Sequence, residues 1–501
     1  MPSFRFVALT FALALPAAAQ TLSLDKTGGA LGGLTTFPIA GPANGGYVLV
    51  LATSERATPV PGLGITLDVP LDLISLSLAL PGFVGTLPAS GRIAPTLLLP
   101  DLAALEGIVL SAQAVCGEPW IVSNLVRVTP QASGTFKPAL TQPSAPILGG
   151  GHAVAPNGRL LFVGGSGPVA QAYASRTEDW SLAGVSFGVG LLSQTTGLAD
   201  GRVLFTGGIG LDGQPTSAAA VYDPATQQTT TLAMAIARAG HGASLLGNGK
   251  VLITGGFETV SLTDPLALFA GIRASTEIFD PTTNTFAPGP NMLEARALHA
   301  SSSLTNGQAL ITGGLTLIPI INVPTVSATA YRFNPSSNSF GLPAFMSGAR
   351  FLHSAVGLSD GKVLLAGGMT LDLTTFLQTL NILDIVIGTR TDCQLYTPSF
   401  LGFGTFTTVQ GMQEGRAGAA IAALPGGGAL IAGGFRLTID FPTQTFVATA
   451  TASADVFRQG PNSLSATGAM ATARLFPTTA NLPDGTIMVL GGGGAAEIYQ
   501  R

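Results

Sequence analysis

The sequence predicts an all-β protein, a seven-bladed β-propeller with an N-terminal β-sandwich domain. Three observations support this fold class. The 501 residues include 66 glycines and 34 prolines, which is typical of a chain with many turns between short strands. Charged residues make up only 10% of the chain, whereas a disordered chain would be richer in charge. An apolar segment ending in two glycines recurs along residues 140–501, and such recurrence indicates a repeat architecture.

The first residues, MPSFRFVALTFALALPAAAQ, predict a signal peptide over residues 1–20. Arg5 supplies the positive charge, residues 6–15 are apolar, and residues 17–19 are a small-residue cleavage site. The apolar run is shorter than the ~20 residues that a transmembrane helix needs. We therefore expect an exported protein, either secreted or located at the cell surface or in the periplasm. Gly, Pro, Asp and Arg interrupt every later apolar stretch, so no transmembrane segment is expected.

Charge and cysteine content narrow the classes further. The formal net charge is −4, which lends little electrostatic support to a nucleic-acid partner. Two cysteines are too few for a disulfide scaffold. Export would allow Cys116 and Cys393 to pair, but spacing alone does not show that they meet, and two buried thiols are the favoured interpretation.

The apolar segment with two terminal glycines occurs seven times. The copies are RLLFVGG, RVLFTGG, KVLITGG, QALITGG, KVLLAGG, GALIAGG and TIMVLGG, with first glycines at 164, 207, 255, 313, 367, 433 and 491. Successive copies lie 43 to 66 residues apart, which accommodates four short strands and a connection of variable length. Each copy is apolar on both sides of its pleat, as expected for a strand whose sheet is packed on both faces.

The surroundings of the seven copies also repeat. Asn-Gly or Asp-Gly precedes six of them and Gly426-Gly427 precedes the other, and all of these pairs suit the positive φ angles of a type I′ hairpin. A third strand such as AAAVYDP or STEIFDP and a short fourth strand such as NTF complete the unit. With a recurring Arg-x-x-His start, these features resemble the Kelch repeat. The resemblance implies the four-stranded blade of Kelch propellers and of the galactose oxidase central domain.

The predicted domains are 21–131 and 132–501. Residues 21–131 lack the double glycine and contain alternating apolar runs such as GYVLVLAT and NLVRVTP, which favours a small antiparallel β-sandwich. This part also resembles a compact β module of secreted bacterial proteins. The last repeat has no fourth strand of its own, and residues 132–140 look like a fourth strand. We therefore expect this N-terminal strand to complete blade seven and close the ring.

Recurring charged residues are the candidate ligand-binding set. Arginines and histidines occupy equivalent places at the start of successive blades: Arg238, Arg296, Arg350, Arg416, Arg474, His241, His299 and His353. Ala419 and Pro477 replace histidine in the last two blades. The arginines either brace neighbouring blades through backbone carbonyls or form a cationic crescent for carboxylate or phosphate groups. No Asp, Glu or Cys cluster accompanies the histidines, so no metal or other cofactor is assigned.

Long apolar insertions follow four of the double glycines, over residues 257–275, 315–327, 369–390 and 435–452. They either pack on one another as hairpins or form an exposed apolar rim. The sequence therefore predicts a non-enzymatic, exported binding module that contacts an unidentified protein or cell-envelope component through this face. Two alternatives remain. One is a galactose-oxidase-like copper oxidoreductase, although the sequence shows no assembled set of copper ligands. The other is a carbohydrate-binding propeller, although only Trp120 and Trp180 could offer an indole ring for a sugar to stack on.

Overall fold

The structure is a computed structural model that describes residues 21–501 except 118, 145–150, 155–159, 164–168, 186–189, 211, 261–269, 319–322, 373, 380–385, 400–402 and 441–444. The predicted signal peptide, residues 1–20, lies outside the described residues. The chain forms two compact units, 1–133 with residue 500 and 134–499 with residue 501. In the described part of the chain, no helix is long and apolar enough to cross a membrane.

The first unit is a small antiparallel β-sandwich. One sheet has the order β1-β3-β8, and the larger has the order β11-β10-β4-β7 with β12 also paired to β10. The bounds are β1 Ser23–Leu24, β3 Ile39–Ala40, β4 Gly46–Ala52, β7 Val84–Thr86, β8 Arg92–Ile93, β10 Leu110–Cys116, β11 Ile121–Val122 and β12 Val126–Val128. Two small ribbons, β2 (Leu34–Thr36) with β9 (Thr96–Leu98) and β5 (Thr58–Val60) with β6 (Ile65–Leu67), and helix α1 (Ile74–Ala79) complete it.

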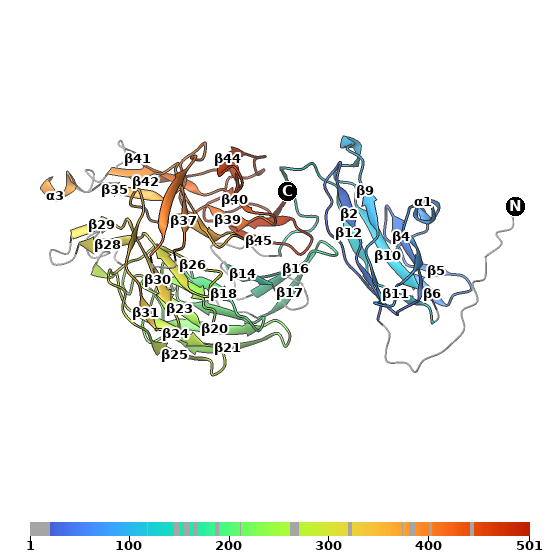
Figure 1. The fold of residues 1–501 in the computed structure, drawn as a ribbon, viewed down its shortest axis with the longest axis horizontal. Helices are drawn as coiled ribbons and strands as arrows, with labels where there is room; N and C mark the ends of the chain where they lie inside the picture. The colour runs from blue at the N-terminus through green and yellow to red at the C-terminus, as the bar shows by residue number, and fades with distance from the viewer. Residues whose placement is uncertain are drawn as a thin grey trace. The chain divides into compact units, whose positions relative to one another are not determined.

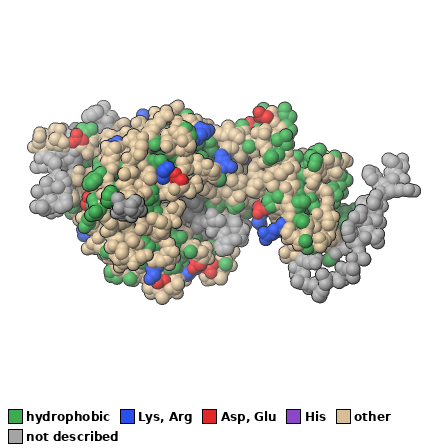
Figure 2. All heavy atoms as spheres, viewed as in Figure 1, with side chains coloured by type: hydrophobic (Ala, Val, Ile, Leu, Met, Phe, Trp, Pro, Cys, Tyr) green, Lys and Arg blue, Asp and Glu red, His purple; other side chains and the backbone are tan. Residues whose placement is uncertain are grey.

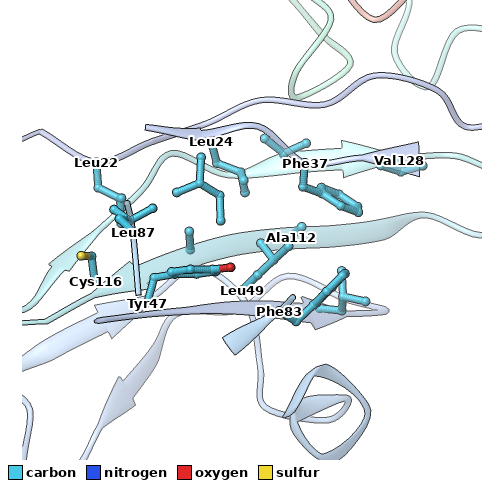
Figure 3. Close-up of a cluster of buried hydrophobic side chains, with 14 of the residues drawn as sticks. Leu22, Leu24, Phe37, Tyr47, Leu49, Phe83, Leu87, Ala112, Cys116 and Val128 are labelled. Atoms are coloured by element: carbon cyan, nitrogen blue, oxygen red, sulfur yellow. The ribbon is translucent and has the colours of Figure 1, made fainter. Parts of the chain in front are cut away.

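The sandwich core explains why these short strands hold together. Leu24, Phe37 and Leu49 are at most 1% exposed and pack between the sheets, with Phe83 edge-on to Phe37 (Figure 3). Strand β4 is buried along most of its length because a second apolar cluster, which includes Val50, lies on its other side. Burial of apolar area on both faces supplies the main stabilisation of so small a unit.

Among the described residues, the second unit contains seven sheets with a path of four strands each, which are the blades, and blade four has one additional strand. In chain order from the inner strand outward they are β14-β15-β16-β17, β18-β19-β20-β21, β22-β23-β24-β25, β26-β27-β30-β31, β33-β34-β37-β38, β39-β40-β43-β44 and β45-β46-β47-β13. The inner strands begin at the residues Gly151, Gln194, Gly242, Ala300, Ser354, Ala420 and Thr478. In every blade the second strand carries the repeated apolar segment, for example β23 Val251–Thr254 and β34 Val363–Ala366.

The remaining strands of the blades are short. Blade one comprises β14 Gly151–Val154, β15 Leu160–Val163, β16 Val169–Ala174 and β17 Asp179–Val185; blade two comprises β18 Gln194–Gly197, β19 Val203–Thr206, β20 Ala218–Asp223 and β21 Gln228–Ala233. Blade three adds β22 Gly242–Leu245, β24 Thr276–Asp280 and β25 Thr285–Pro288; blade four comprises β26 Ala300–Ser303, β27 Ala309–Thr312, β30 Thr329–Asn334 and β31 Ser339–Phe340, with β32 Ala344–Phe345 also paired to β30. Blade five adds β33 Ser354–Gly357, β37 Cys393–Thr397 and β38 Thr405–Val409; blade six comprises β39 Ala420–Ala423, β40 Gly428–Ala432, β43 Ala454–Arg458 and β44 Ser463–Ala466; blade seven comprises β45 Thr478–Asn481, β46 Ile487–Leu490, β47 Glu497–Gln500 and β13 Thr135–Pro138.

The blades form a closed ring. Each inner strand lies against the inner strand of the next blade, from β14 through β18, β22, β26, β33 and β39 to β45, and β45 in turn lies against β14. In Figure 1 the blades are arranged around the centre formed by these inner strands, which we call the axis of the ring. Strand β13 occupies the outer edge of blade seven beside β47, and the Phe136 and Tyr499 rings lie 4.9 Å apart. The predicted fold class, a seven-bladed propeller with an N-terminal β-sandwich, is confirmed.

The double glycines are required where neighbouring blades meet. In blade four, Gly313 and Gly314 both have positive φ, at 61° and 104°. A Cβ atom on Gly313 would lie 2.3 Å from the carbonyl oxygen of Arg350 in blade five, so only glycine fits. The Gly314 N–H donates to that same carbonyl at 2.9 Å. The pair therefore links adjacent blades through main-chain atoms.

Three of the long insertions form two-stranded hairpins, which we call the crown. The hairpins are β28 (Leu315–Ile318) with β29 (Val323–Val326), β35 (Met369–Asp372) with β36 (Val386–Thr389), and β41 (Phe435–Asp440) with β42 (Thr445–Ala450); the short helix α3 (Phe376–Thr379) lies within the second. Neighbouring hairpins touch through β29 with β35 and β36 with β41, and all three gather at one side of the ring in Figure 1. The interpretation that the insertions pack on one another as hairpins is therefore correct for these three, whereas residues 261–269 of the insertion 257–275 lie outside the described residues.

Candidate functional site

The five recurring arginines are internal braces. Each is at most 1% exposed. The Arg296 guanidinium donates to the carbonyl oxygens of Gly313, at 2.9 Å, and Thr329, at 3.2 Å, which join the second and third strands of its own blade. Arg238 makes the same contacts to Gly255 and Ser275. The structural interpretation is correct in that each guanidinium donates to backbone carbonyls, but the brace joins strands of one blade and not two neighbouring blades.

A carboxylate neutralises each guanidinium. The pairs are Arg238–Glu277, Arg296–Glu294, Arg350–Asp392, Arg416–Asp455 and Arg474–Glu497. Burial lowers the pKa of Arg296, and the nearby Glu294 charge opposes this shift. The paired geometry keeps the guanidinium charged inside the protein. These contacts correct the prediction of a cationic crescent, because neither an open guanidinium nor an uncompensated charge remains for an anionic ligand at these five positions.

The three histidines connect neighbouring blades. The Nε2 atoms of His241, His299 and His353 lie 2.8 Å from the hydroxyl oxygens of Thr206, Thr254 and Thr312, each in the preceding blade. Burial lowers the pKa of His241 and His299 to about 3, with an added contribution from the neighbouring arginine charge. The pKa of His353 is lowered for the same reasons. The three imidazoles are therefore neutral at ordinary pH.

The partner residues change together from blade to blade. Where Ala419 replaces the histidine, Ala366 replaces the threonine of the preceding blade; where Pro477 does so, Ala432 stands in that place. An unpaired buried hydroxyl or imidazole would lose its hydrogen bond without compensation. The matched substitutions show that the Arg-x-x-His histidine is one half of an interblade pair.

An axial cavity of about 430 Å³ lies inside the ring. Described residues of blades two to seven line it, in layers that follow the position in the repeat. The layer next to the apolar base of the crown, which we call the collar, consists of Leu192, Gly240, Leu298, Leu352, Gly418 and Phe476. The next layer consists of Ser193, His241, His299, His353, Ala419 and Pro477. Gln194, Thr195, Ser354, Ile421 and Thr478 lie beyond them.

The collar is held by a chain of main-chain hydrogen bonds that runs around the axis. The N–H of Gly240 donates to the carbonyl of Leu192 at 2.9 Å, and Leu298 donates to Gly240 at 2.8 Å. Leu352 continues to Leu298 and Gly418 to Leu352, both at 2.9 Å. All six collar residues have φ between 45° and 62°, in the left-handed region. Sequence reasoning missed this layer because the collar position varies between Gly, Leu and Phe and so presents no recurring residue type.

The structure also shows the surroundings of the two tryptophans and the two cysteines. The Trp180 ring lies 5.3 Å from those of both Phe162 and Tyr173, so it packs within blade one. Trp120 is 39% exposed and belongs to the sandwich unit. Cys116 and Cys393 are both buried free thiols, and burial raises the pKa of Cys393 to about 12. Among the described residues, no three His, Cys, Asp or Glu side chains gather in a way that could hold a metal ion.

The comparisons with known proteins identify no family for this chain. No protein family model matches the chain, and no curated protein matches it. One similar solved structure is a fungal alcohol oxidase of the AA5 family in complex with copper. It shares 14% identity over 62% of this chain and 74% of its own, with a TM-score of 0.37. At that score the similarity carries no argument about activity. The fold and the candidate site define the class of protein as a seven-bladed β-propeller with an axial cavity and a hairpin crown.

Proposed function

We propose that the chain is a Kelch-type propeller exported as a non-enzymatic binding module, and that the crown is its binding face. The repeat signature supports the Kelch assignment, and residues 1–20 support export. The observation that carries the binding role is the crown itself. Three consecutive blades extend the same face with hairpins, while the recurrent polar side chains beneath them are occupied within the propeller.

The crown has the composition of a contact surface for a protein or cell-envelope component. Its base is a continuous apolar cluster that includes Phe351, Met369 and Phe435. Val386 and Val447, on two of the hairpins, remain 61% and 42% exposed. Figure 2 shows charged side chains only singly or in small groups on the face in view. A sparsely charged apolar surface favours burial against a partner.

Shortening the crown tests the proposal. In the full-length protein, residues 436–449 are replaced by an Asn-Gly turn, and residues 370–388 are replaced likewise in a second variant. The immobilised proteins are incubated with solubilised envelope from the producing cells, and the bound proteins are quantified. We expect the same partner to be lost from both variants. A matched control, Lys250→Glu with Lys362→Glu at the turns of the opposite face, should retain it. Retention by all variants would contradict the proposal.

Metal analysis of the same purified protein tests the copper alternative. Under the proposed function, the purified, folded protein should contain substoichiometric copper and have no oxidase activity. Stoichiometric copper together with oxidase activity would replace the binding module by a galactose-oxidase-like copper oxidoreductase.

A further inference from the structure

The collar keeps apolar side chains where the backbone would favour glycine. Leu192, Leu298, Leu352 and Phe476 have φ of 62°, 54°, 52° and 45°, whereas blades three and six use Gly240 and Gly418 at the same position. Glycine adopts this conformation freely, but a leucine or phenylalanine there is strained. The chain of main-chain hydrogen bonds from Leu192 to Gly418 accompanies these φ values. It does not explain the side chains, because Gly240 and Gly418 take part in the same chain.

Packing accounts for only part of these side chains. The Phe476 ring lies 4.9 Å from that of Phe435, and Leu298 and Leu352 touch the apolar base of the crown. Leu192 is not part of that cluster, and all four side chains are only half-buried while they line the cavity. Strained residues that face a cavity are characteristic of ligand clamps. The collar therefore presents apolar surface to the cavity itself.

The deeper layers add hydrogen-bonding groups without charge. Ser193, Gln194, Thr195, Ser354 and Thr478 supply hydroxyl and amide groups to the lining. None of the described lining residues is Asp, Glu, Lys or Arg. The sequence of β14, the inner strand of blade one, also contains none of these four types. The nearby arginines are paired within their own blades, and a charged ligand would lose its hydration without gaining a counter-ion.

We infer that the axial cavity is a binding site for a small uncharged organic molecule that has an apolar part and a hydrogen-bonding group. Leu192, Leu298, Leu352 and Phe476 contact the apolar part, and the hydroxyl and amide layer receives the polar group. The cavity volume of about 430 Å³ exceeds the ~150 Å³ that holds a benzene molecule, so an aromatic ring with a substituent fits. This site adjoins the base of the crown, but its lining does not include the exposed hairpin residues Val386 and Val447 of the surface proposed for macromolecular binding.

Three probe molecules of nearly the same shape test whether the cavity prefers an uncharged ligand. Benzamide, benzoate and benzamidinium have nearly the same shape and carry charges of zero, minus one and plus one. Binding to the full-length protein is measured by ligand-observed NMR, with Kd on the order of millimolar expected for ligands of this size. We expect benzamide to bind about tenfold or more tightly than either ion. Equal or tighter binding of benzoate, or no binding of benzamide, would overturn the inference, and the former outcome would restore an anion site.

Collar variants locate the site. Leu192→Gly and Leu352→Gly remove the apolar side chain and relieve the backbone, so benzamide affinity should fall several-fold while the melting temperature changes little. Gly240→Leu fills the cavity from blade three; its φ of 60° matches those of the collar leucines, and only the end of the Leu298 side chain must move. It should also weaken binding. Leu342→Ala, at a surface position 69% exposed, is the control.

The outcome is independent of the crown experiment. Crown-shortened variants should still bind benzamide, and collar variants should still capture the envelope partner. Normal benzamide affinity in all three collar variants would show that the probe binds elsewhere and would refute the site. If Leu352→Gly unfolds the protein, the Leu192→Gly and Gly240→Leu results decide.

Discussion

At the scale of single residues, the recurring arginine has two separate structural roles. Its carbonyl accepts from the second glycine of the preceding blade, as Arg416 does from Gly368 at 2.9 Å. Its guanidinium braces its own blade and meets a carboxylate, as Arg416 meets Asp455 at 2.7 Å. Burial raises the pKa of Asp455 in spite of this pairing, so the ion pair is held in a poorly solvated position. An anionic ligand would have to displace these internal partners.

Arg416→Ala should destabilise the fold strongly. The change leaves Asp455, 2% exposed, without its cationic partner, and breaking a buried pair costs about 3–5 kcal/mol. Denaturant unfolding measures the loss. Arg202→Ala removes a partly exposed pair with Asp200 together with hydrogen bonds to Asn284 and Pro281, and should cost less, about 1–2 kcal/mol. Arg416→Met with Asp455→Leu should recover most of the stability, and equal losses for Arg416→Ala and Arg202→Ala would contradict the bracing role.

The interblade histidines should make the propeller acid-sensitive. Their unfolded pKa is near 6.5, while the folded pKa of His241 and His299 is about 3. Between these values the unfolded chain binds protons that the folded chain excludes, so stability is complete above pH 6.5 and falls as the pH is lowered toward 3. Each histidine contributes at most about 1.4 kcal/mol per pH unit.

A blade-swap variant isolates this effect. Thr254→Ala with His299→Ala copies the Ala366–Ala419 combination that the protein already contains. Unfolding free energies measured from pH 7 to pH 4 should show a shallower loss for the variant than for the natural chain. An unchanged slope would mean that His299 is already protonated in the folded state.

At the scale of elements, the blade is defined by where its backbone must adopt positive φ. The hairpin turn and the double glycine both need it, but for different reasons. Gly249, in the Asn-Gly turn, has φ of 81° and open space where a Cβ atom would lie, whereas Gly313 faces the Arg350 carbonyl. The turn is a local requirement and the double glycine is an interblade requirement.

Two alanine substitutions separate these requirements. Gly249→Ala should cost about 1 kcal/mol, because only the backbone conformation is unfavourable. Gly313→Ala adds a contact of 2.3 Å with main-chain oxygen and should cost several kcal/mol or prevent folding. Thermal unfolding compares them. Similar losses for the two variants would show that the neighbouring blade yields easily at this contact.

At the scale of the whole molecule, the ring depends on one strand from the start of the propeller. Strand β13 covers the edge of β47, and Phe136 packs against Tyr499 in the cluster between blades six and seven. Without that cover, β47 would present an unpaired edge to other chains. Closure therefore joins segments that are more than 350 residues apart along the chain.

Phe136→Asp in the full-length protein should weaken closure. The carboxylate would replace an aromatic ring in an apolar cluster, and we expect a lower melting temperature and concentration-dependent self-association through the β47 edge. Light scattering and thermal unfolding measure both. Phe345→Asp, at a position 69% exposed, should behave like the natural protein. A monomeric Phe136→Asp variant of unchanged stability would show that closure does not need this strand.

The sequence by itself determined the all-β class, the seven blades and their hairpin turns. These features are local, since an Asn-Gly turn, an apolar strand and a double glycine lie within about twenty residues of one another and repeat in register. The N-terminal sandwich could be predicted from its alternating strands, although helix α1 could not, because its short apolar run has no distinguishing period.

Only the tertiary structure decided what the recurrent residues do. The direction of Arg296, the threonine partner of His299 and the half-buried collar at Leu352 depend on backbone from other strands or blades, which sequence spacing does not locate. The physical reason is that the role of a charged side chain or of a strained leucine depends on the groups that surround it in the fold. The arginines act as internal braces because they are buried beside a carboxylate. Gly, Leu and Phe at one repeat position line a cavity because the ring of blades brings them together.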